Sequence, residues 1–199
     1  MSEALFDGRR LILASTSPFR RELLTRLDLP FTVRSPDVDE TPQPGEDAPS
    51  LVARLAAWKA RWVAEREPSA LVIGSDQVAV LQGNIIGKPG DHQRAIEQLR
   101  QASGRVVTFY TGVCLLDSAS SQRQVAVELF HVAFRELTTE MVEHYLRREQ
   151  PYQCAGSFKS EGLGIALFER LEGDDPTSLI GLPLIRLTRM LEAAGVTVL

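Results

Sequence analysis

The sequence predicts an α/β fold in which one long, twisted, mixed β-sheet is flanked by helices. Short apolar runs typical of buried strands recur along the chain, and amphipathic helical segments separate many of them. Strands and helices do not alternate strictly, so a sheet built only from βαβ units is not expected. The length of 199 residues allows one sizeable core, which can divide into two lobes around a cleft. We therefore expect a single domain spanning residues 1–199.

The first half of the chain predicts a strand–helix–strand unit, an irregular loop, a second helix and a long strand. Residues 18–28 form a helix that begins at a proline, and residues 49–67 have helical apolar spacing that stops at Pro68. Residues 35–45 are too rich in proline and acid for a regular element. The expected strands are 11–14, 31–34 and 71–81, the last turning at 82–84.

The second half predicts a long hairpin between two helices and a mixed C-terminal region. Residues 105–116 and 122–135 are β-rich and are joined by a polar turn at 117–121. Helices are expected at 91–102 and 138–149. A glycine-rich polar segment at 154–164 leads into a predicted strand at 165–168, and a final helix follows residues 179–183 and ends near residue 194.

Charge and hydropathy exclude several classes of partner. The net charge of -4 argues against broad binding to nucleic acid or anionic membranes, which require a basic face. No apolar stretch approaches the length of a membrane span, and the apolar run at 11–14 is too short for a signal peptide. We therefore expect a cytoplasmic protein with neither a nucleic-acid nor a membrane partner.

The segment that follows the first strand is typical of an anion site. Ser15 and Ser17 supply hydroxyls at a predicted helix start, where free N–H groups and the helix dipole favour negative charge. Arg20 and Arg21 lie in the first turn and can bind phosphate oxygens. The alternative is an ordinary N-cap followed by two solvated arginines.

Carboxylates and lysines add to this pattern. Asp76 interrupts an otherwise apolar strand, where a carboxylate is costly unless it has a role. The loop residues Asp37, Asp39 and Glu40 form an acidic cluster of the type that binds hard cations, so Mg²⁺ or Mn²⁺ is expected rather than zinc. Lysines at three positions can neutralise phosphates: Lys59, Lys88 and Lys159. For Lys59, in the middle of a predicted helix, the alternative is a solvated residue.

Absent motifs narrow the chemistry. The chain has no P-loop, no G-x-G-x-x-G dinucleotide motif and no G-x-S-x-G nucleophile elbow. Hydroxyls, arginines, lysines and carboxylates together suit a phosphate-rich ligand with a divalent cation. Sugar-phosphate and nucleotide enzymes both share this combination.

The chain resembles the Maf family of nucleoside triphosphate pyrophosphatases over nearly its whole length. Family segments recur in order at Leu11–Arg21 (LILAS-x-SP-x-RR), Asp39-Glu40, Arg54–Ala60 (RLA-x-x-KA), Gly74–Gln77 (GSDQ), Gly87–Pro89 (GKP), Ser103-Gly104, Thr111-Gly112, Ala155–Ser157 (AGS), Glu161–Gly164 (EG-x-G) and Gly181–Pro183 (GLP). The resemblance implies a two-lobed α/β structure similar to the inosine triphosphate pyrophosphatases, with the site in the cleft, and a homodimer.

The resemblance also implies roles for the candidate site residues. Asp76 is expected to be the general base, and Glu40 is expected to hold Mg²⁺ or Mn²⁺, with Asp76 sharing it. Lys59 and Lys88 would neutralise phosphate oxygens in hydrolysis of the bond between the α- and β-phosphates. The residues expected to cradle the triphosphate are Ser15, Ser17, Arg20 and Arg21.

Three further residues make the chain similar to the bacterial branch of the family that hydrolyses 7-methyl-GTP: Phe19, Gln77 and Glu161. An aromatic ring at Phe19 can stack on the cationic 7-methylguanine base, and the Glu161 carboxylate can accept hydrogen bonds from guanine N1–H and its exocyclic amine. Gln77 can contact a base edge or orient the nucleotide. The alternatives are a dTTP and UTP pyrophosphatase, or a nucleotide-binding regulator of septum formation without essential catalysis.

Overall fold

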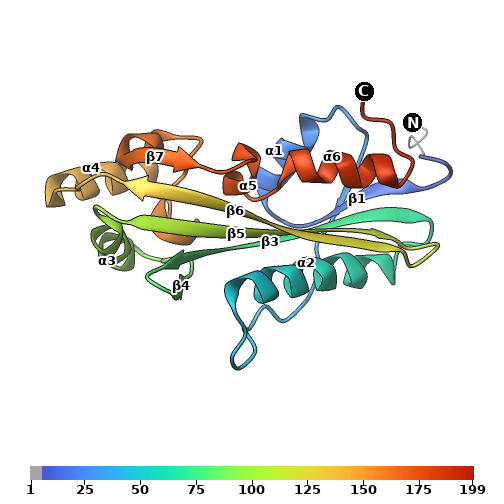
Figure 1. The fold of residues 1–199 in the computed structure, drawn as a ribbon, viewed down its shortest axis with the longest axis horizontal. Helices are drawn as coiled ribbons and strands as arrows, with labels where there is room; N and C mark the ends of the chain where they lie inside the picture. Colours follow the sequence, from blue (N-terminus) through green and yellow to red (C-terminus); the bar gives the residue numbers. More distant parts are fainter. Residues whose placement is uncertain (1–5) are drawn as a thin grey trace.

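A mixed seven-stranded sheet forms the body of the molecule, as the sequence predicts (Figure 1). The structure, a computed structural model, describes residues 6–199. The strands lie in the order β2-β1-β3-β5-β6-β7, and β4 pairs with β3. The elements in chain order are β1 (Arg10–Ala14), α1 (Pro18–Thr25), β2 (Thr32–Arg34), α2 (Ala48–Ala64), β3 (Ala70–Leu81), β4 (Asn84–Ile86), α3 (His92–Ala102), β5 (Val106–Asp117), β6 (Arg123–Phe134), α4 (Thr139–Glu149), β7 (Phe168–Glu172), α5 (Pro176–Ile180) and α6 (Leu184–Ala193).

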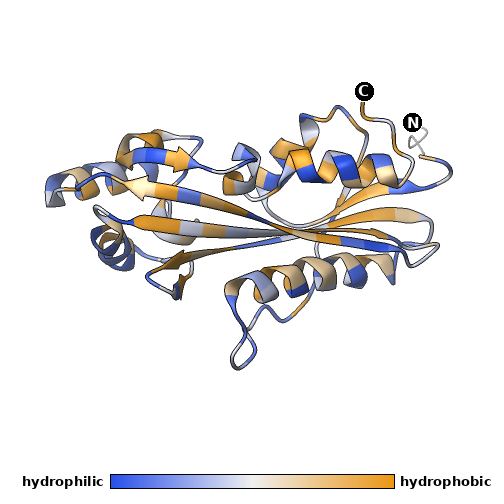
Figure 2. Cartoon of the chain, viewed as in Figure 1, coloured by the Kyte–Doolittle hydropathy of each residue, from blue (hydrophilic) through white to orange (hydrophobic). Residues whose placement is uncertain are grey.

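Three long antiparallel strands run through the sheet from end to end. β3, β5 and β6 contain 12 residues each. Their apolar residues are the orange stretches of the long strands in Figure 2. β1 pairs in parallel with β3 and β2, and the remaining pairings are antiparallel. The parallel strands at one end place the β1–α1 loop beside the middle of β3. The β1–α1 loop and the middle of β3 both contribute residues to the candidate active site described below.

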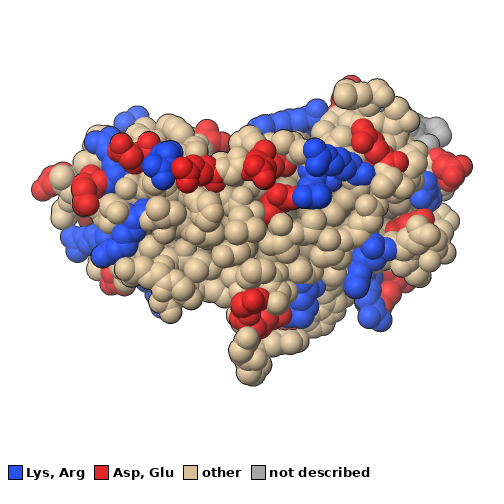
Figure 3. Space-filling model, in the orientation of Figure 1, with Lys and Arg blue, Asp and Glu red and all other residues tan. Residues whose placement is uncertain are grey.

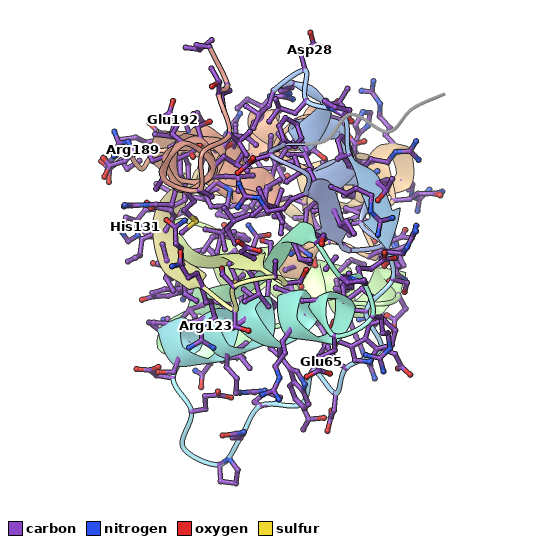
Figure 4. The ribbon with its side chains drawn as sticks, turned by 90° about the vertical axis from the view of Figure 1, so that its right-hand side faces the viewer. Asp28, Glu65, Arg123, His131, Arg189 and Glu192 are labelled. Atoms are coloured by element: carbon purple, nitrogen blue, oxygen red, sulfur yellow. The ribbon has the colours of Figure 1, made fainter. Side chains whose placement is uncertain are left out.

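Helices cover the sheet on both faces and divide the core into clusters. At the β1 end, α2 packs on one face with Ala56 and Ala60, whereas α6 packs on the other with Leu187 and Leu191. Figure 4 shows α2 and α6 on opposite sides of the sheet, with Arg189 and Glu192 of α6 pointing outward. A third cluster, at the opposite end, packs α3 and α4 against the long strands.

Two glycines let α2 approach the sheet unusually closely. A Cβ atom at Gly74 would lie 2.1 Å from the carbonyl oxygen of Ala56, and one at Gly112 would lie 2.3 Å from that of Val52. Both glycines flank Asp76, because Gly74 lies two residues before it and Gly112 is its partner in the β3–β5 register. Close packing of α2 at this point brings its side chains to Asp76.

The C-terminal region differs from the sequence prediction. The strand expected at 165–168 is wrong: Leu163–Leu167 forms a 3-10 turn, and β7 begins only at Phe168. The apolar Leu163 and Leu167 pack into the α3–α4 cluster instead of lying in a sheet. A short helix, α5, also precedes the final helix. Within residues 6–199, no helix has the length and apolar character needed to cross a membrane.

Candidate active site

A cavity of about 620 Å³ lies where the β1–α1 loop, α2, the middle of β3 and residues 153–161 meet. Its lining includes eleven of the residues that the sequence singled out: Ser15, Ser17, Phe19, Arg20, Glu40, Lys59, Asp76, Gln77, Lys88, Lys159 and Glu161. These residues come from segments that are far apart in the chain, and the fold brings them to one hollow. Figure 3 shows one face of the molecule, on which acidic and basic side chains are interspersed toward its edges.

Lys59 joins two carboxylates in the wall of the cavity. Its Nζ donates to Oδ1 of Asp76 and forms an ion pair with Oε1 of Glu40, each at 2.6 Å. The Lys59 and Asp76 side chains are only 6% and 10% exposed, whereas that of Glu40 is 59% exposed. The lysine is therefore a buried partner of Asp76 and not a solvated residue, which separates the two readings that the sequence allowed.

Three cations of the cavity act on the pKa of Glu40. Partial burial works to raise the pKa of Glu40, but the hydrogen bond from Lys59 and the charges of Lys59, Lys88 and Arg20 lower that pKa below its ordinary value. Glu40 is consequently ionised at neutral pH. An ionised carboxylate can serve as an oxygen ligand to a hard cation, although here Lys59 already occupies one of its oxygens.

Arg20 is fixed by a carbonyl from the far end of the chain. Its Nε donates to the carbonyl oxygen of Gly181 at 2.8 Å, and Ser75 Oγ donates to the same oxygen at 2.8 Å. Burial lowers the pKa of Arg20, and the opposing charges of Asp76 and Glu40 work to raise it. A guanidinium stays protonated in proteins, so Arg20 contributes a positive charge beside the carboxylates. Gly181 was recognisable in the sequence only as a family position, and nothing local indicated that its carbonyl oxygen would accept from Arg20.

The hydroxyls at the start of α1 cap the helix, and the two arginines diverge. Ser17 is the N-cap, with its Oγ accepting from the Arg20 N–H at 3.4 Å, and Ser15 Oγ accepts from the Ser17 N–H at 3.1 Å. Arg21 does not line the main cavity. It is exposed and borders a second hollow with Glu22 and Thr25, which shares the Ser15–Pro18 segment with the main cavity. Successive residues of a helix point about 100° apart, so only one of two adjacent arginines can face the site.

Gln77 is anchored to the protein through its amide nitrogen. Nε2 donates to Thr111 Oγ1 at 2.9 Å and to the carbonyl oxygens of Ser178 and Leu179 at 2.8 and 3.1 Å. The amide is thereby held in one orientation, and its donors are used within the fold. A contact from Gln77 to a ligand would therefore use its Oε1 acceptor.

Phe19 and Glu161 both border the cavity without belonging to the core. The Phe19 ring is half-buried, and Glu161 is exposed at the end of the 153–161 segment. Lys88 follows β4 and is also exposed. Each is open to a ligand entering the cavity.

Arg54 and Glu46 connect the Glu40 loop to α2. Arg54 Nε and Nη2 donate to the two carboxylate oxygens of Glu46 at 2.6 and 2.7 Å, and Nη2 also donates to the carbonyl oxygen of Thr41 at 3.2 Å. The hydrogen bond from Arg54 lowers the pKa of Glu46 to about 2. Arg54 was recognisable in the sequence only as a family position. Its eight-residue spacing from Glu46, across the start of α2, was the available signal.

The cavity offers two neighbouring carboxylates to a hard cation, fewer than a metal site built from protein ligands alone would use. Across residues 6–199, no group of three or more His, Cys, Asp or Glu side chains is arranged to hold a metal. Glu40 and Asp76 supply two oxygen donors, which matches the way Mg²⁺ is often held by one or two carboxylates and substrate phosphates. Asp39 caps the Thr41 N–H at 2.9 Å, and neither it nor Asp37 lines the cavity.

Comparison with known proteins agrees with the resemblance read from the motifs. The family Maf, described as Maf-like protein, matches residues 10–194. A protein of Nitrosococcus oceani named 7-methyl-GTP pyrophosphatase is 61% identical over 189 residues, which cover 95% of each chain. Proteins of the same name from Pseudomonas aeruginosa and Polaromonas sp. are 60% and 58% identical, over 94% and 95% of this chain and 98% and 86% of their own. The chain therefore belongs to the Maf family of Maf-like proteins.

Proposed function

We propose that the protein is a nucleoside triphosphate pyrophosphatase that hydrolyses 7-methyl-GTP to 7-methyl-GMP and diphosphate, removing a modified nucleotide from the cytoplasmic pool. The observation that carries this proposal is the single cavity that joins the Lys59–Asp76–Glu40 cluster to Phe19 and Glu161. The name shared by relatives about 60% identical to this chain supports the choice of substrate.

The reaction is the attack of a water oxygen on the α-phosphorus. The bond from this phosphorus to the oxygen that bridges the α- and β-phosphates breaks, and diphosphate leaves with the bonding electrons. Asp76 accepts the proton of the attacking water, since its carboxylate faces the cavity from a rigid strand. Lys59, Arg20 and Lys88 offset the negative charge of the phosphates.

A divalent cation completes the proposal, with Glu40 and Asp76 as its protein ligands. Both carboxylates line the cavity and share the Lys59 ammonium, so they lie near one another. When bound, Mg²⁺ or Mn²⁺ would neutralise phosphate oxygens and stabilise charge in the transition state. Ser15 and Ser17, at the N-terminus of α1, would bind phosphate oxygens through their hydroxyls, favoured by the positive end of the helix dipole.

Base selection rests on Phe19, Gln77 and Glu161. The 7-methylguanine ring carries a positive charge, which favours stacking on the half-buried Phe19 ring. The Glu161 carboxylate accepts from N1–H and from the exocyclic amine, a pair of donors that thymine and uracil do not present. Gln77 offers Oε1 as a further acceptor, because its Nε2 is used by the fold.

The test is a product analysis with Mg²⁺ or Mn²⁺ across 7-methyl-GTP, GTP, dTTP, UTP and ATP. The proposal predicts preferential release of 7-methyl-GMP and diphosphate. A preference for dTTP or UTP would keep the reaction and overturn the base assignment. Binding of these nucleotides without any turnover would instead favour a regulatory protein.

The proposed enzyme is a homodimer, and three exposed apolar side chains support this. Val106 of β5 and Val125 and Leu129 of β6 lie on the face of the sheet where α2 buries Cys114, but α2 leaves these three side chains partly uncovered. Val106, Val125 and Leu129 are 48%, 39% and 45% exposed. Figure 3 shows few charged side chains across the middle of the molecule, where β6 runs in Figure 1. Light scattering should give twice the chain mass, and Leu129→Glu should give the monomer; a monomeric wild type would contradict the proposal.

A further inference from the structure

The turn that carries Glu161 is bound by one residue of α4, Glu149. Glu149 is the last residue of that helix, and its carboxylate contacts both sides of the turn. Oε2 accepts the Leu163 N–H at 2.7 Å, and Oε1 lies 3.6 Å from Nζ of Lys159. The same Nζ donates to the Glu149 carbonyl oxygen at 2.9 Å. Glu161 is midway between the two residues that Glu149 binds.

The backbone around this contact is packed so that the turn has little room to shift. A Cβ at Gly162 would lie 2.8 Å from the Glu149 carboxylate, and one at Gly164 would lie 2.3 Å from the Lys159 carbonyl oxygen. The Lys159 N–H also donates to the hydroxyl of Tyr145, one helical turn before Glu149, at 3.0 Å. Two residues of α4 therefore hold the turn at its entry; at its exit, Glu149 accepts the Leu163 N–H while the Leu163 side chain packs into the α3–α4 cluster.

Lys159 is used in this arrangement even though it lines the cavity. Its ammonium is bound to the carboxylate and the carbonyl oxygen of Glu149, with its side chain 28% exposed. In this geometry its charge is directed to the end of α4, where the carbonyl groups also favour a cation. Glu161, whose Oε2 accepts from the neighbouring Ser160 hydroxyl at 3.4 Å, is thus left as the exposed ionisable side chain of the turn that can meet a ligand.

We propose that Glu149 is a positioning residue for nucleobase selection, which acts by fixing the Lys159–Leu163 turn so that Glu161 meets the base in one orientation. This inference rests on the proposed function, because it takes Glu161 as the residue that reads the base. A carboxylate that accepts hydrogen bonds from two donors of one base must have a fixed orientation, because proximity alone does not align both of its oxygens with the donors. Glu149 supplies that geometry without touching the substrate.

The experiment measures kcat and KM for 7-methyl-GTP and UTP in Glu149→Ala, Glu149→Gln and Glu161→Ala. Glu149→Ala should lower the preference for 7-methyl-GTP over UTP roughly tenfold through KM, with kcat for UTP unchanged. Glu149→Gln keeps an acceptor for the Leu163 N–H and should recover part of the preference. Glu143→Ala is the matched control, since Glu143 is on the same helix and pairs with Arg147 and His92 instead.

Hydrogen exchange of the peptide spanning residues 158–164 gives a readout that does not depend on activity. The inference predicts faster exchange there in Glu149→Ala than in the wild type or in Glu143→Ala. Unchanged exchange, or an unchanged preference when Glu161→Ala abolishes it, would overturn the role of Glu149 and leave the proposed function intact. A wild type with no preference for 7-methyl-GTP would instead overturn the proposed function, and exchange alone would then decide whether Glu149 fixes the turn.

Discussion

The ammonium of Lys59 on α2 lies 2.6 Å from the carboxylate of Asp76 on β3, and both side chains are nearly inaccessible to solvent. The contact depends on how closely α2 rests on the sheet, because Gly74 and Gly112 offer no side chain to hold the helix away. The two glycines therefore allow the close packing of α2 that places Lys59 beside Asp76, the proposed general base.

Gly74→Ala should destabilise the protein and separate Lys59 from Asp76. The new methyl group would meet the carbonyl oxygen of Ala56 at 2.1 Å, and backbone cannot move aside as a flexible side chain can. Overpacking of this kind costs about 1–3 kcal/mol. Urea unfolding measures the loss. Gly87→Ala serves as the control, since a Cβ there meets nothing within 4 Å; equal effects of the two substitutions would contradict the argument.

Lys59→Met should reduce turnover roughly 100-fold and shift the acid side of the pH profile. The hydrogen bond and the charge of Lys59 both lower the pKa of Glu40, so removing them raises that pKa. If ionised Glu40 is needed, activity will then begin to fall at a higher pH on acidification than in the wild type. The measurement is kcat/KM against pH for both proteins. An acid limb that stays in place would show that Lys59 does not act through Glu40.

Glu46→Gln should cost stability at neutral pH and cost little in acid. Arg54 lowers the pKa of Glu46 from 4.5 to about 2 in the folded protein, so the folded state binds this proton less readily than the unfolded chain. The ion pair therefore stabilises the fold above the ordinary pKa, and its contribution disappears as the pH falls from 4.5 toward about 2. Urea unfolding of both proteins across this range gives the difference, which a pH-independent result would contradict.

Phe19→Arg combined with Gln77→Thr should weaken hydrolysis of 7-methyl-GTP more than hydrolysis of UTP. The double variant removes the aromatic face for the cationic base and the amide anchored on Thr111 and Ser178. Steady-state kinetics on the two substrates measure the change, and UTP serves as the internal control. Equal losses on both would show that these residues do not select the base.

The sequence predicts most of the sheet, because apolar runs interrupted by turn residues are a local signal. Asp76 could be found for the same reason, as a carboxylate inside a buried strand. The prediction failed at residues 165–168, where apolar residues pack as a 3-10 turn and the charged β7 becomes a strand only by pairing with β6.

Contacts between distant segments account for the rest of what the sequence left open. The orientation of Gln77 is set by Thr111 and Ser178, which are 34 and 101 positions away. The hydrogen bond from Arg20 Nε to the Gly181 carbonyl oxygen joins residues 161 positions apart. Nothing local in the sequence encodes either contact, and nothing local distinguishes Arg20 from Arg21 until the rotation of α1 is known.

The most direct test compares the wild type with Asp76→Asn on 7-methyl-GTP, following both binding and products. The account predicts that the wild type releases 7-methyl-GMP and diphosphate, and that Asp76→Asn still binds 7-methyl-GTP while turnover falls by about three orders of magnitude or more. Turnover that survives in Asp76→Asn, or a wild type that releases 7-methyl-GDP and inorganic phosphate, would contradict it.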